Sequence, residues 1–303
     1  MKKFKLVAML LAVVMIVPVF AGCKSEKETK IEAFTVTDMV WREVTFNEPA
    51  DKIVVLTASD CEILFALGAG EAVIGRGTYC DYPQEALAVT EVNSGYETNV
   101  EQIIALEPQV IITSKMDQSE EQIELFENAG IDVIVTDAQT IEGTYRCIEL
   151  IGKVVGKEAE AEKVINEMVD KFVNLAAKAD ENKGTVYFEA SPLMYDLWTT
   201  GEGTFMNELA NMLGITNIFN DVEGWAKVSE EQVIERDPDF IFTTTADFGE
   251  EPSPVDEIMS RVGWQNMKAI KNSKVYMIES NLVARPGPRL ADAMEAMFSI
   301  IYE

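Results

Sequence analysis

The chain has 303 residues, with 25 Lys and Arg against 52 Asp and Glu and no histidine, so its net charge is −27. A surface this acidic repels phosphate backbones and anionic lipid head groups, so we expect no nucleic-acid partner and a basic protein partner. The absence of histidine removes the commonest metal ligand and the commonest general base together, and we expect no resident metal or other cofactor.

The chain begins with the pattern of an export signal. Lys2, Lys3 and Lys5 precede an apolar run over residues 6–20, and small residues then lead to Cys23. A bilayer span needs about 20 apolar residues, so this run favours a cleaved signal over its alternative, a retained anchor helix. Cleavage would remove three lysines and no acids, which leaves 22 basic against 52 acidic residues and a net charge of −30.

The mature chain alternates between short apolar runs and amphipathic stretches. We expect strands at residues 53–57, 72–75, 110–113, 133–135, 185–188, 240–243 and 275–278. We expect helices at residues 100–107, 120–129, 141–155, 157–180, 205–213 and 230–236, near 254–271 and from 289 onward. Ser59 and Glu62 form a capping-box pattern for one further helix, which ends at the glycines of 68–70. This alternation predicts an α/β fold with mostly parallel sheets.

The most regular stretch is residues 157–180. Its apolar positions recur at steps of four and three, and 24 helical residues would extend about 36 Å. Such a helix is long enough to bridge two lobes, although a surface helix on one domain is the alternative. We place a signal peptide at 1–22, a flexible tether at 23–35, an N-terminal lobe at 36–145, a helical linker at 146–182 and a C-terminal lobe at 183–303.

An internal repeat connects the two halves. Residues 101–113 align with residues 231–243 without a gap, and both segments start with Glu-Gln and place a proline at the eighth position. Each predicts a helix, an acid-Pro turn and a buried strand. Duplication of one unit indicates two similar α/β lobes that flank the long helix, with a cleft between them.

Recognisable catalytic motifs are missing from the sequence. The glycines at 68–70 follow a helix instead of a strand, and there is no Gly-x-Ser-x-Gly elbow or P-loop. A Ser-His-Asp triad is excluded in its usual form, because the chain has no histidine. Cys61, Cys80 and Cys147 are odd in number and widely spaced, which matches neither a disulfide framework nor a zinc ribbon. We therefore expect a binding protein, and an exported carboxylate-dependent enzyme stays open as the alternative.

Aromatic residues gather in predicted loops of both halves. Tyr79 follows a strand end, Tyr96 precedes the expected helix at 100, Trp198 follows a strand end and Trp225 precedes the expected helix at 230. Open α/β sheets bind ligands at such strand ends, although each ring is also suited to a lobe's core. Two or three such rings would hold a flat, bulky ligand without metal ligation.

Several segments together resemble a known family. They are the lipoprotein-box-like FAGC at 20–23, the repeat, GRGTYCDYP at 75–83, WTTG at 198–201, WAKVSEEQV at 225–233 and RPGPR at 285–289. From about residue 36 onward, the chain resembles the helical-backbone substrate-binding proteins of ABC importers. Within that family it is most similar to the members that bind vitamin B12, and iron-siderophore and haem binders are further relatives.

The resemblance implies two Rossmann-like lobes joined by one long helix, with only modest closure. It places Tyr79, Trp198, Trp225 and Arg285 in the ligand cleft. Gly95 stands where the family has a tryptophan, so neighbouring Tyr96 is the candidate substitute, and Asn281 stands where an aspartate is expected.

The same resemblance implies how the protein would work. Cys23 would carry a lipid that holds a monomeric protein on the outer face of the cytoplasmic membrane. Glu101 and Glu231 would meet arginines of the permease. Within the family, the alternative to a corrinoid is a ferric siderophore or haem, with Arg76, Arg285 and Arg289 pairing with acidic groups and Tyr79 or Cys80 ligating iron.

Overall fold

The computed structural model describes residues 33–95, 98–116, 118–245, 249 and 252–303. The predictions that concern the signal peptide, Cys23 and Tyr96 lie outside these residues. Within the described part of the chain, no helix is long and apolar enough to cross a membrane.

Thirteen strands are formed in the described residues. They are β1 (Phe34–Thr37), β2 (Glu43–Phe46), β3 (Ile53–Val55), β4 (Val73–Gly77), β5 (Glu91–Val92), β6 (Val110–Ser114), β7 (Asp132–Thr136), β8 (Gly184–Glu189), β9 (Leu197–Thr200), β10 (Ile215–Asn217), β11 (Trp225–Val228), β12 (Phe240–Thr243) and β13 (Val275–Met277). The α-helices are α1 (Ala58–Ala66), α2 (Val100–Ile104), α3 (Glu120–Asn128), α4 (Ile141–Val154), α5 (Glu158–Ala176), α6 (Phe205–Met212), α7 (Glu230–Arg236), α8 (Pro254–Ser260), α9 (Lys268–Lys271), α10 (Ser280–Val283) and α11 (Leu290–Tyr302).

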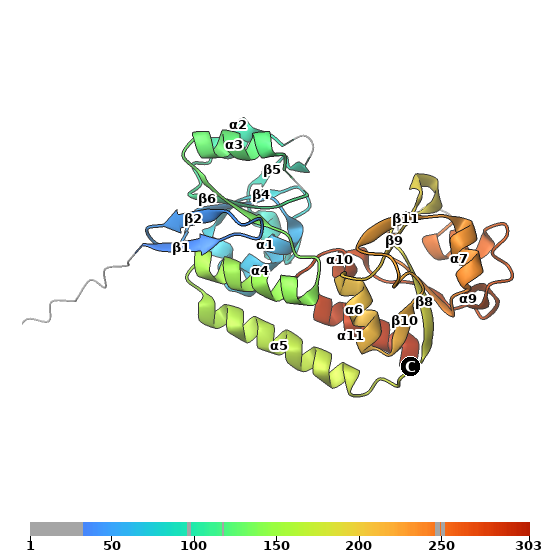
Figure 1. Ribbon diagram of the computed structural model, residues 1–303. Coiled ribbons are helices and arrows are strands. Elements are labelled where there is room, and N and C mark those ends of the chain that lie inside the picture. Colours follow the sequence, from blue (N-terminus) through green and yellow to red (C-terminus); the bar gives the residue numbers. More distant parts are fainter. Residues whose placement is uncertain (1–32, 96–97, 117, 246–248, 250–251) are drawn as a thin grey trace, which may run out of the picture. The chain divides into compact units, whose positions relative to one another are not determined.

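The N-terminal lobe is built on a five-stranded sheet of order β5-β4-β3-β6-β7, in which every pair is parallel. Alternate residues of each strand face opposite layers: Val54 and Ile111 pack with α2 and α3, whereas Val55 and Ile112 pack with α1 and α4. Figure 1 shows these two helical layers above and below the sheet. Because both faces are covered, the central strands β3 and β6 consist largely of apolar residues.

The C-terminal lobe has a second parallel sheet, of order β10-β8-β12-β13. In both sheets the chain order reverses next to the first strand, between β3 and β6 and between β8 and β12, which is the switch point of an open α/β sheet. Two short antiparallel pairs, β1 with β2 and β9 with β11, complete the strand pairing. The predicted α/β class with mostly parallel sheets is confirmed.

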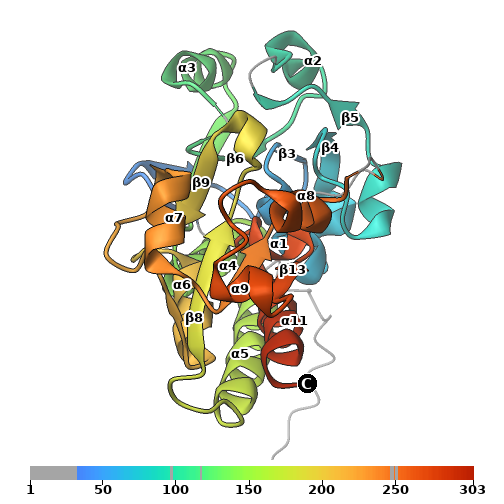
Figure 2. The same cartoon turned by 90° about the vertical axis from the view of Figure 1, so that its right-hand side faces the viewer.

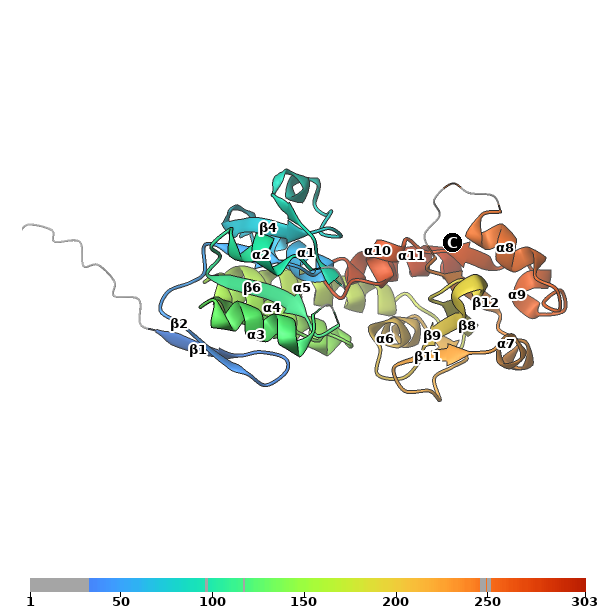
Figure 3. The same ribbon diagram turned by 90° about the horizontal axis from the view of Figure 1, so that it is seen from above.

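Helix α5 runs below both lobes and packs against α4 and α11 (Figures 1 and 2). Four residues of its predicted stripe are buried and the fifth is partly buried: Ala161, Met168, Phe172 and Leu175, and Ile165. The helix was predicted to reach Asp180 but ends at Ala176. Beyond that residue, the backbone N–H groups of Lys178 and Ala179 donate to carbonyls three residues back, as in a tighter helical turn. Seen from above, α10 lies beside the N-terminal lobe and α11 leads back under the C-terminal one (Figure 3).

The internal repeat is confirmed in three dimensions. Helix α2 and strand β6 correspond to α7 and β12 at a constant offset of 130 residues. Asn99 and Ser229 cap the two helices by accepting a hydrogen bond from the backbone N–H three residues on. The chain then leaves each helix through an acidic residue with positive φ, 53° at Glu107 and 45° at Asp237, before the proline.

The predicted cap at Ser59 is wrong. Helix α1 begins at Ala58, two residues earlier than a cap at Ser59 would place it, and Ser59 is buried inside its first turn. Glu62 is not a capping residue, because its carboxylate is buried and binds arginines of the C-terminal lobe. A buried charge requires such a partner, whereas a capping interaction alone would leave it uncompensated.

The N-terminal boundary of the described fold also differs from the expectation. Strand β1 begins at Phe34, inside the segment predicted as tether, and the Phe34 and Phe46 rings stack at 5.6 Å across the β1–β2 pair. The lobe and linker boundaries remain a proposal. Each parallel sheet nevertheless lies within one of the proposed intervals, over residues 53–136 and 184–277.

Candidate ligand-binding site

A cavity of about 480 Å³ lies between the two lobes. The N-terminal lobe contributes residues at or just after the ends of the five strands of its parallel sheet, namely 56–60, 79, 94–95, 114–116 and 136–139. The C-terminal lobe contributes Phe205, Trp225 and residues 284–286. The cavity therefore occupies the carboxyl edge of a parallel sheet at its switch point, where open α/β sheets bind ligands.

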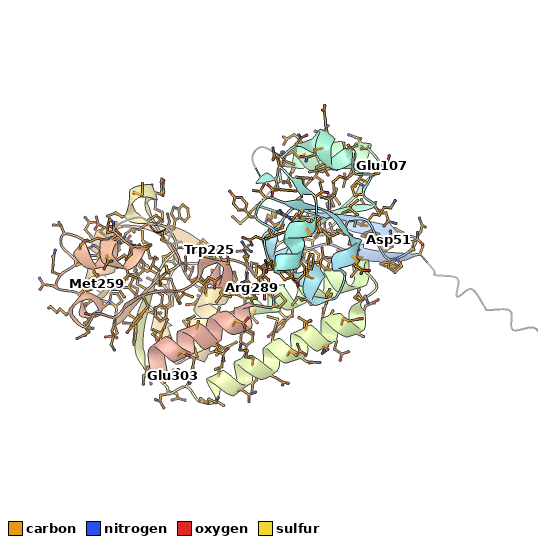
Figure 4. The ribbon with its side chains drawn as sticks, turned by 180° about the vertical axis from the view of Figure 1, so that it is seen from behind. Asp51, Glu107, Trp225, Met259, Arg289 and Glu303 are labelled. Atoms are coloured by element: carbon orange, nitrogen blue, oxygen red, sulfur yellow. The ribbon has the colours of Figure 1, made fainter. Side chains whose placement is uncertain are left out.

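The C-terminal wall of the cavity is aromatic. Trp225 and Phe205 meet edge to face, with ring centroids 6.1 Å apart. Phe205 is held against the other lobe, because its backbone N–H donates to the carbonyl of Gln139 at 2.8 Å. Figure 4 labels Trp225 and Arg289, both on segments that adjoin the N-terminal lobe.

Trp198 lies on the same ribbon as Trp225 but outside the cavity lining. Trp225 pairs with Thr200 in the β9–β11 register, and Trp198 is two residues from Thr200, so both indoles project from one face. The two tryptophans were predicted in loops, and the structure places them in antiparallel strands. Gly201 allows this ribbon to close, because a Cβ there would lie 1.9 Å from the carbonyl oxygen of Val222.

Tyr79 is the aromatic residue of the N-terminal wall, and its side chain is 72% exposed. The next residue, Cys80, points inward, with its Sγ 3.7 Å from the carbonyl of Val55. Contact with Cys61 and burial raise the pKa of the Cys80 thiol, which keeps it protonated. The Cys80 side chain is fully buried and lies outside the cavity lining, so it does not face a ligand there, whereas the Tyr79 phenol is accessible to one.

Arg285 lines the cavity, but its charge is already compensated across the lobes. One of its terminal nitrogens, Nη1, lies 3.0 Å from Oε1 of Glu62 and 2.6 Å from Oδ1 of Asp81. Burial by itself would lower the pKa of Arg285, but the hydrogen bonds to Asp81 and Glu62 raise it above its ordinary value. Arg285 thus joins the C-terminal lobe to α1 and to the loop after β4.

The other two arginines proposed for ligand pairing lie outside the cavity lining. Arg76 is buried and binds Glu91 at 3.0 Å. Arg289 binds Glu62 and stacks on the ring of Tyr82, with its Cζ 3.9 Å from the centroid. Both guanidinium groups therefore support the fold.

The cavity floor carries a buried polar cluster. Oδ2 of Asp60 accepts a hydrogen bond from Thr136 at 2.9 Å, and its Oδ1 accepts one from the thiol of Cys147 at 3.4 Å. Burial, together with the charge of Asp60, raises the pKa of Cys147 well above its ordinary value. The floor is therefore a hydrogen-bonded support in which the thiol stays protonated.

A charged pair that the sequence patterns did not indicate lies at the rim of the cavity. Lys115 Nζ lies 3.2 Å from Oδ2 of Asp137, and the following residue, Met116, is 86% exposed. Lys115 follows β6 and Asp137 follows β7, so the rule that ligands bind at strand ends would have found both. Phe205, the first residue of α6, was also missed, since only its helix was predicted.

The predicted site residues thus fall into three groups. Tyr79, Trp225 and Arg285 meet at the cavity, and Trp198 shares the ribbon face of Trp225. Gly95 lines the cavity, and the next residue in the chain, Tyr96, is not among the described residues. The two glutamates proposed for docking lie outside the lining and are exposed in first turns, Glu101 in α2 and Glu231 in α7.

No group of three His, Cys, Asp or Glu side chains in the described ranges is placed to hold a metal ion. The site is thus an aromatic cavity between two α/β lobes, with charged residues at its rim and floor. Residues 53–282 match the family model of the periplasmic binding proteins, and the chain belongs to this family.

Two curated relatives and one solved structure are similar along most of the chain. An uncharacterized ABC transporter substrate-binding lipoprotein, YvrC of Bacillus subtilis, is 35% identical, covering 97% of this chain and 95% of its own. The vitamin B12-binding protein of Vibrio parahaemolyticus is 26% identical, covering 82% and 88%. A possible iron-binding periplasmic solute-binding protein from Staphylococcus epidermidis superposes with a TM-score of 0.72 at 28% identity, covering 84% and 100%.

Proposed function

We propose that this protein binds a corrinoid in the cavity between its lobes and delivers it to the permease of an ABC importer. The observation that carries this proposal is the aromatic wall, in which Trp225 packs on Phe205 and shares a ribbon face with Trp198. A ring of this kind buries about 150 to 250 Å². At about 25 cal/mol/Å², each ring stabilises a bound macrocycle by at most ~4 to 6 kcal/mol before the cost of association.

The similar proteins support this choice. The Bacillus relative is an ABC transporter substrate-binding lipoprotein, and the Vibrio relative binds vitamin B12. A corrinoid is flat, bulky and partly apolar, which suits a cavity with rings on both walls, Tyr79 on one and Trp225 on the other.

A ferric siderophore or haem is the second candidate. Tyr79 favours it, because an accessible phenol oxygen in the cavity is a suitable iron ligand where histidine is absent. The similar Staphylococcus structure is that of a possible iron-binding protein.

Delivery would take place outside the cytoplasmic membrane. Cys23 would carry the lipid, residues 24–33 would connect it to β1, and Glu101 and Glu231 would dock one lobe each to basic residues of the permease. The protein would act as a monomer, because the proposed docking uses both lobes of one chain.

Parallel titration with cyanocobalamin, haemin and a ferric siderophore tests the ligand. Binding of a coloured macrocycle beside Trp225 should quench fluorescence at near-stoichiometric addition, and calorimetry should show matching heat. The Trp225→Phe variant should lose most of this quenching. Trp41→Phe is the matched control, since Trp41 is 78% exposed and lies outside the cavity lining.

The three ligands give three distinct outcomes. Quenching and heat with cyanocobalamin support the corrinoid proposal, and their absence at micromolar protein overturns it. Binding of haemin or the siderophore alone selects the second candidate. Mass spectrometry of the recovered ligand tests the enzymatic alternative, since conversion on incubation would show turnover and an unchanged mass would show binding only.

A further inference from the structure

We infer that Lys115 binds an anionic group of the ligand and exchanges its partner Asp137 for that group. This inference rests on the proposed function and narrows the ligand class. The described cavity lining holds two cations, Lys115 and Arg285. Arg285 is compensated by Glu62 and Asp81, and its side chain is only 11% exposed.

Lys115 is placed differently. Its backbone N–H donates to the carbonyl of Thr136 at 2.9 Å, so the root of the side chain is fixed at the end of β6. The side chain itself is 63% exposed, and its ion pair with Asp137 measures 3.2 Å. An exposed ion pair of this kind contributes at most about 1 kcal/mol to stability. An incoming anion can therefore replace Asp137 as the partner of Lys115 at little cost in free energy.

Asp137 keeps a hydrogen-bond donor when Lys115 turns away. Its other carboxylate oxygen, Oδ1, accepts a hydrogen bond from Nε2 of Gln139 at 3.0 Å. The Asp137 side chain is 23% exposed, so water also reaches it. The exchange therefore leaves no charge both buried and uncompensated.

The internal repeat shows that this cation belongs to one lobe only. At the offset of 130 residues, Lys115 corresponds to Thr245, which follows β12 and is uncharged. The ligand would therefore place its anionic group on the N-terminal wall and its apolar face on Trp225 and Phe205. The polarity of the two walls thus sets the orientation of the bound molecule.

A local cation is needed because the chain carries a net charge of −27, which opposes an anionic ligand. The group that Lys115 recognises is a phosphodiester, as in the nucleotide loop of a complete corrinoid, or a carboxylate, as in the propionates of haem. Lysine suits either one, since it binds as a point charge with rotatable donors.

The experiment compares Lys115→Gln, Asp137→Asn and wild type against paired ligands. Cyanocobalamin is paired with dicyanocobinamide, which lacks the phosphodiester, and haemin is paired with its dimethyl ester. Lys115→Gln should weaken binding of the anionic member by about tenfold and leave the other member unchanged. Asp137→Asn should tighten the anionic member, because Lys115 then has no competing partner.

Lys163→Gln controls for the change in net charge, since Lys163 is exposed on α5 and pairs with Glu167 at 3.7 Å. It should leave both members of each pair unchanged. Wild-type affinity for cyanocobalamin reports on the proposed function, whereas the difference within a pair reports on Lys115. If Lys115→Gln weakens binding of the anionic member of the cobalamin pair alone, the recognised group is a phosphodiester. If it does so for the haemin pair alone, the group is a carboxylate. If Lys115→Gln loses the same affinity for both members of a pair, or loses no affinity at all, the inference is overturned.

Discussion

Glu62 and Arg289 form a buried ion pair that joins the two lobes, although 227 residues separate them in the chain. Nε of Arg289 donates to Oε2 at 2.8 Å, and Nη2 donates to Oε1 at 2.6 Å. The same carboxylate also accepts from Arg285 at 3.0 Å, so two cations share one buried anion, and Arg285 pairs with Asp81 in addition. The lobes are therefore connected by this ion cluster as well as by α5.

Replacing Glu62 with Gln should strongly destabilise the protein. The substitution leaves Arg285 and Arg289 without their shared buried counter-charge, which lowers the free energy of unfolding by about 3 to 5 kcal/mol. Urea denaturation measures the loss. Glu167→Gln removes a carboxylate from an exposed pair and should change the free energy by less than about 1 kcal/mol. Equal effects of the two substitutions would contradict the role of the cluster.

Asp81 should make stability depend on pH in the acid range. Partial burial would raise the pKa of Asp81, but the hydrogen bond and charge of Arg285 hold it below its ordinary value of 3.8. Its stabilising contribution is thus present above pH 3.8 and is lost as pH falls through the lower pKa of the folded state. The stability difference between wild type and Asp81→Asn should shrink as pH is lowered from about 5 to about 2.

Asp132 provides the opposite case for this measurement. Burial, with a smaller effect of Glu127, raises the pKa of Asp132, so its charged form weakens the fold above that pKa. Asp132→Asn should therefore be more stable than wild type near neutral pH and should lose this advantage in acid. The urea midpoints of Asp81→Asn and Asp132→Asn, each relative to wild type, are measured across this pH range. If both differences changed with pH in the same direction, the opposite pKa shifts assigned to Asp81 and Asp132 would be contradicted.

Reversing the charge of the two repeat-related glutamates should abolish delivery. Glu101→Lys and Glu231→Lys should each lower uptake by a reconstituted transporter at least about tenfold, because like charges would face each other at the docking surface. Ligand affinity of the purified variants should stay unchanged.

Glu121→Lys is the matched control for this experiment. Its own backbone N–H and the Ser119 hydroxyl lower the pKa of Glu121, as the equivalent groups and Ser229 do for Glu231. The Glu121 and Glu231 variants therefore lose the same helix-start interactions, and Glu101 also lies in the first turn of its helix. Equal transport by all three, or unfolding of the first two, would identify these glutamates as helix starts only.

Replacing Cys23 with Ser should release the protein from the membrane. Stable attachment would depend on the lipid at this residue, so the variant should appear in the soluble fraction after cell lysis. The intact mass of wild type should also exceed that of the mature polypeptide by the attached lipid. Complete retention of the variant with membranes would instead indicate an uncleaved apolar anchor.

The parallel sheets were predictable because their strands are buried on both faces. The apolar runs at 110–113 and 240–243 coincide with β6 and β12 almost residue for residue, and their common offset predicted the second lobe. Helix α5 was predictable for a similar reason, since Met168 and Phe172 lie on one long stripe.

The antiparallel pairs and the ion cluster were not predictable in this way. Strands β9 and β11 have four residues each and adjoin Gly201 and Gly224, so they have the composition of loops. Their pairing depends on contacts between separate segments, which periodicity does not report. Glu62 meets Arg285 and Arg289 across the two lobes, which a local pattern does not report, so its spacing from Ser59 suggested a cap instead.

The core that α5 shares with both lobes also governs how the protein unfolds. One continuous apolar cluster includes Ile53 of the N-terminal sheet, Phe172 of α5 and Phe240 of the C-terminal sheet. Neither sheet can lose its packing without exposing the shared part of this cluster to water. Thermal unfolding should thus be a single cooperative transition, with a van't Hoff enthalpy equal to the calorimetric one. Either lobe expressed alone would expose the surface that α5 covers and would aggregate.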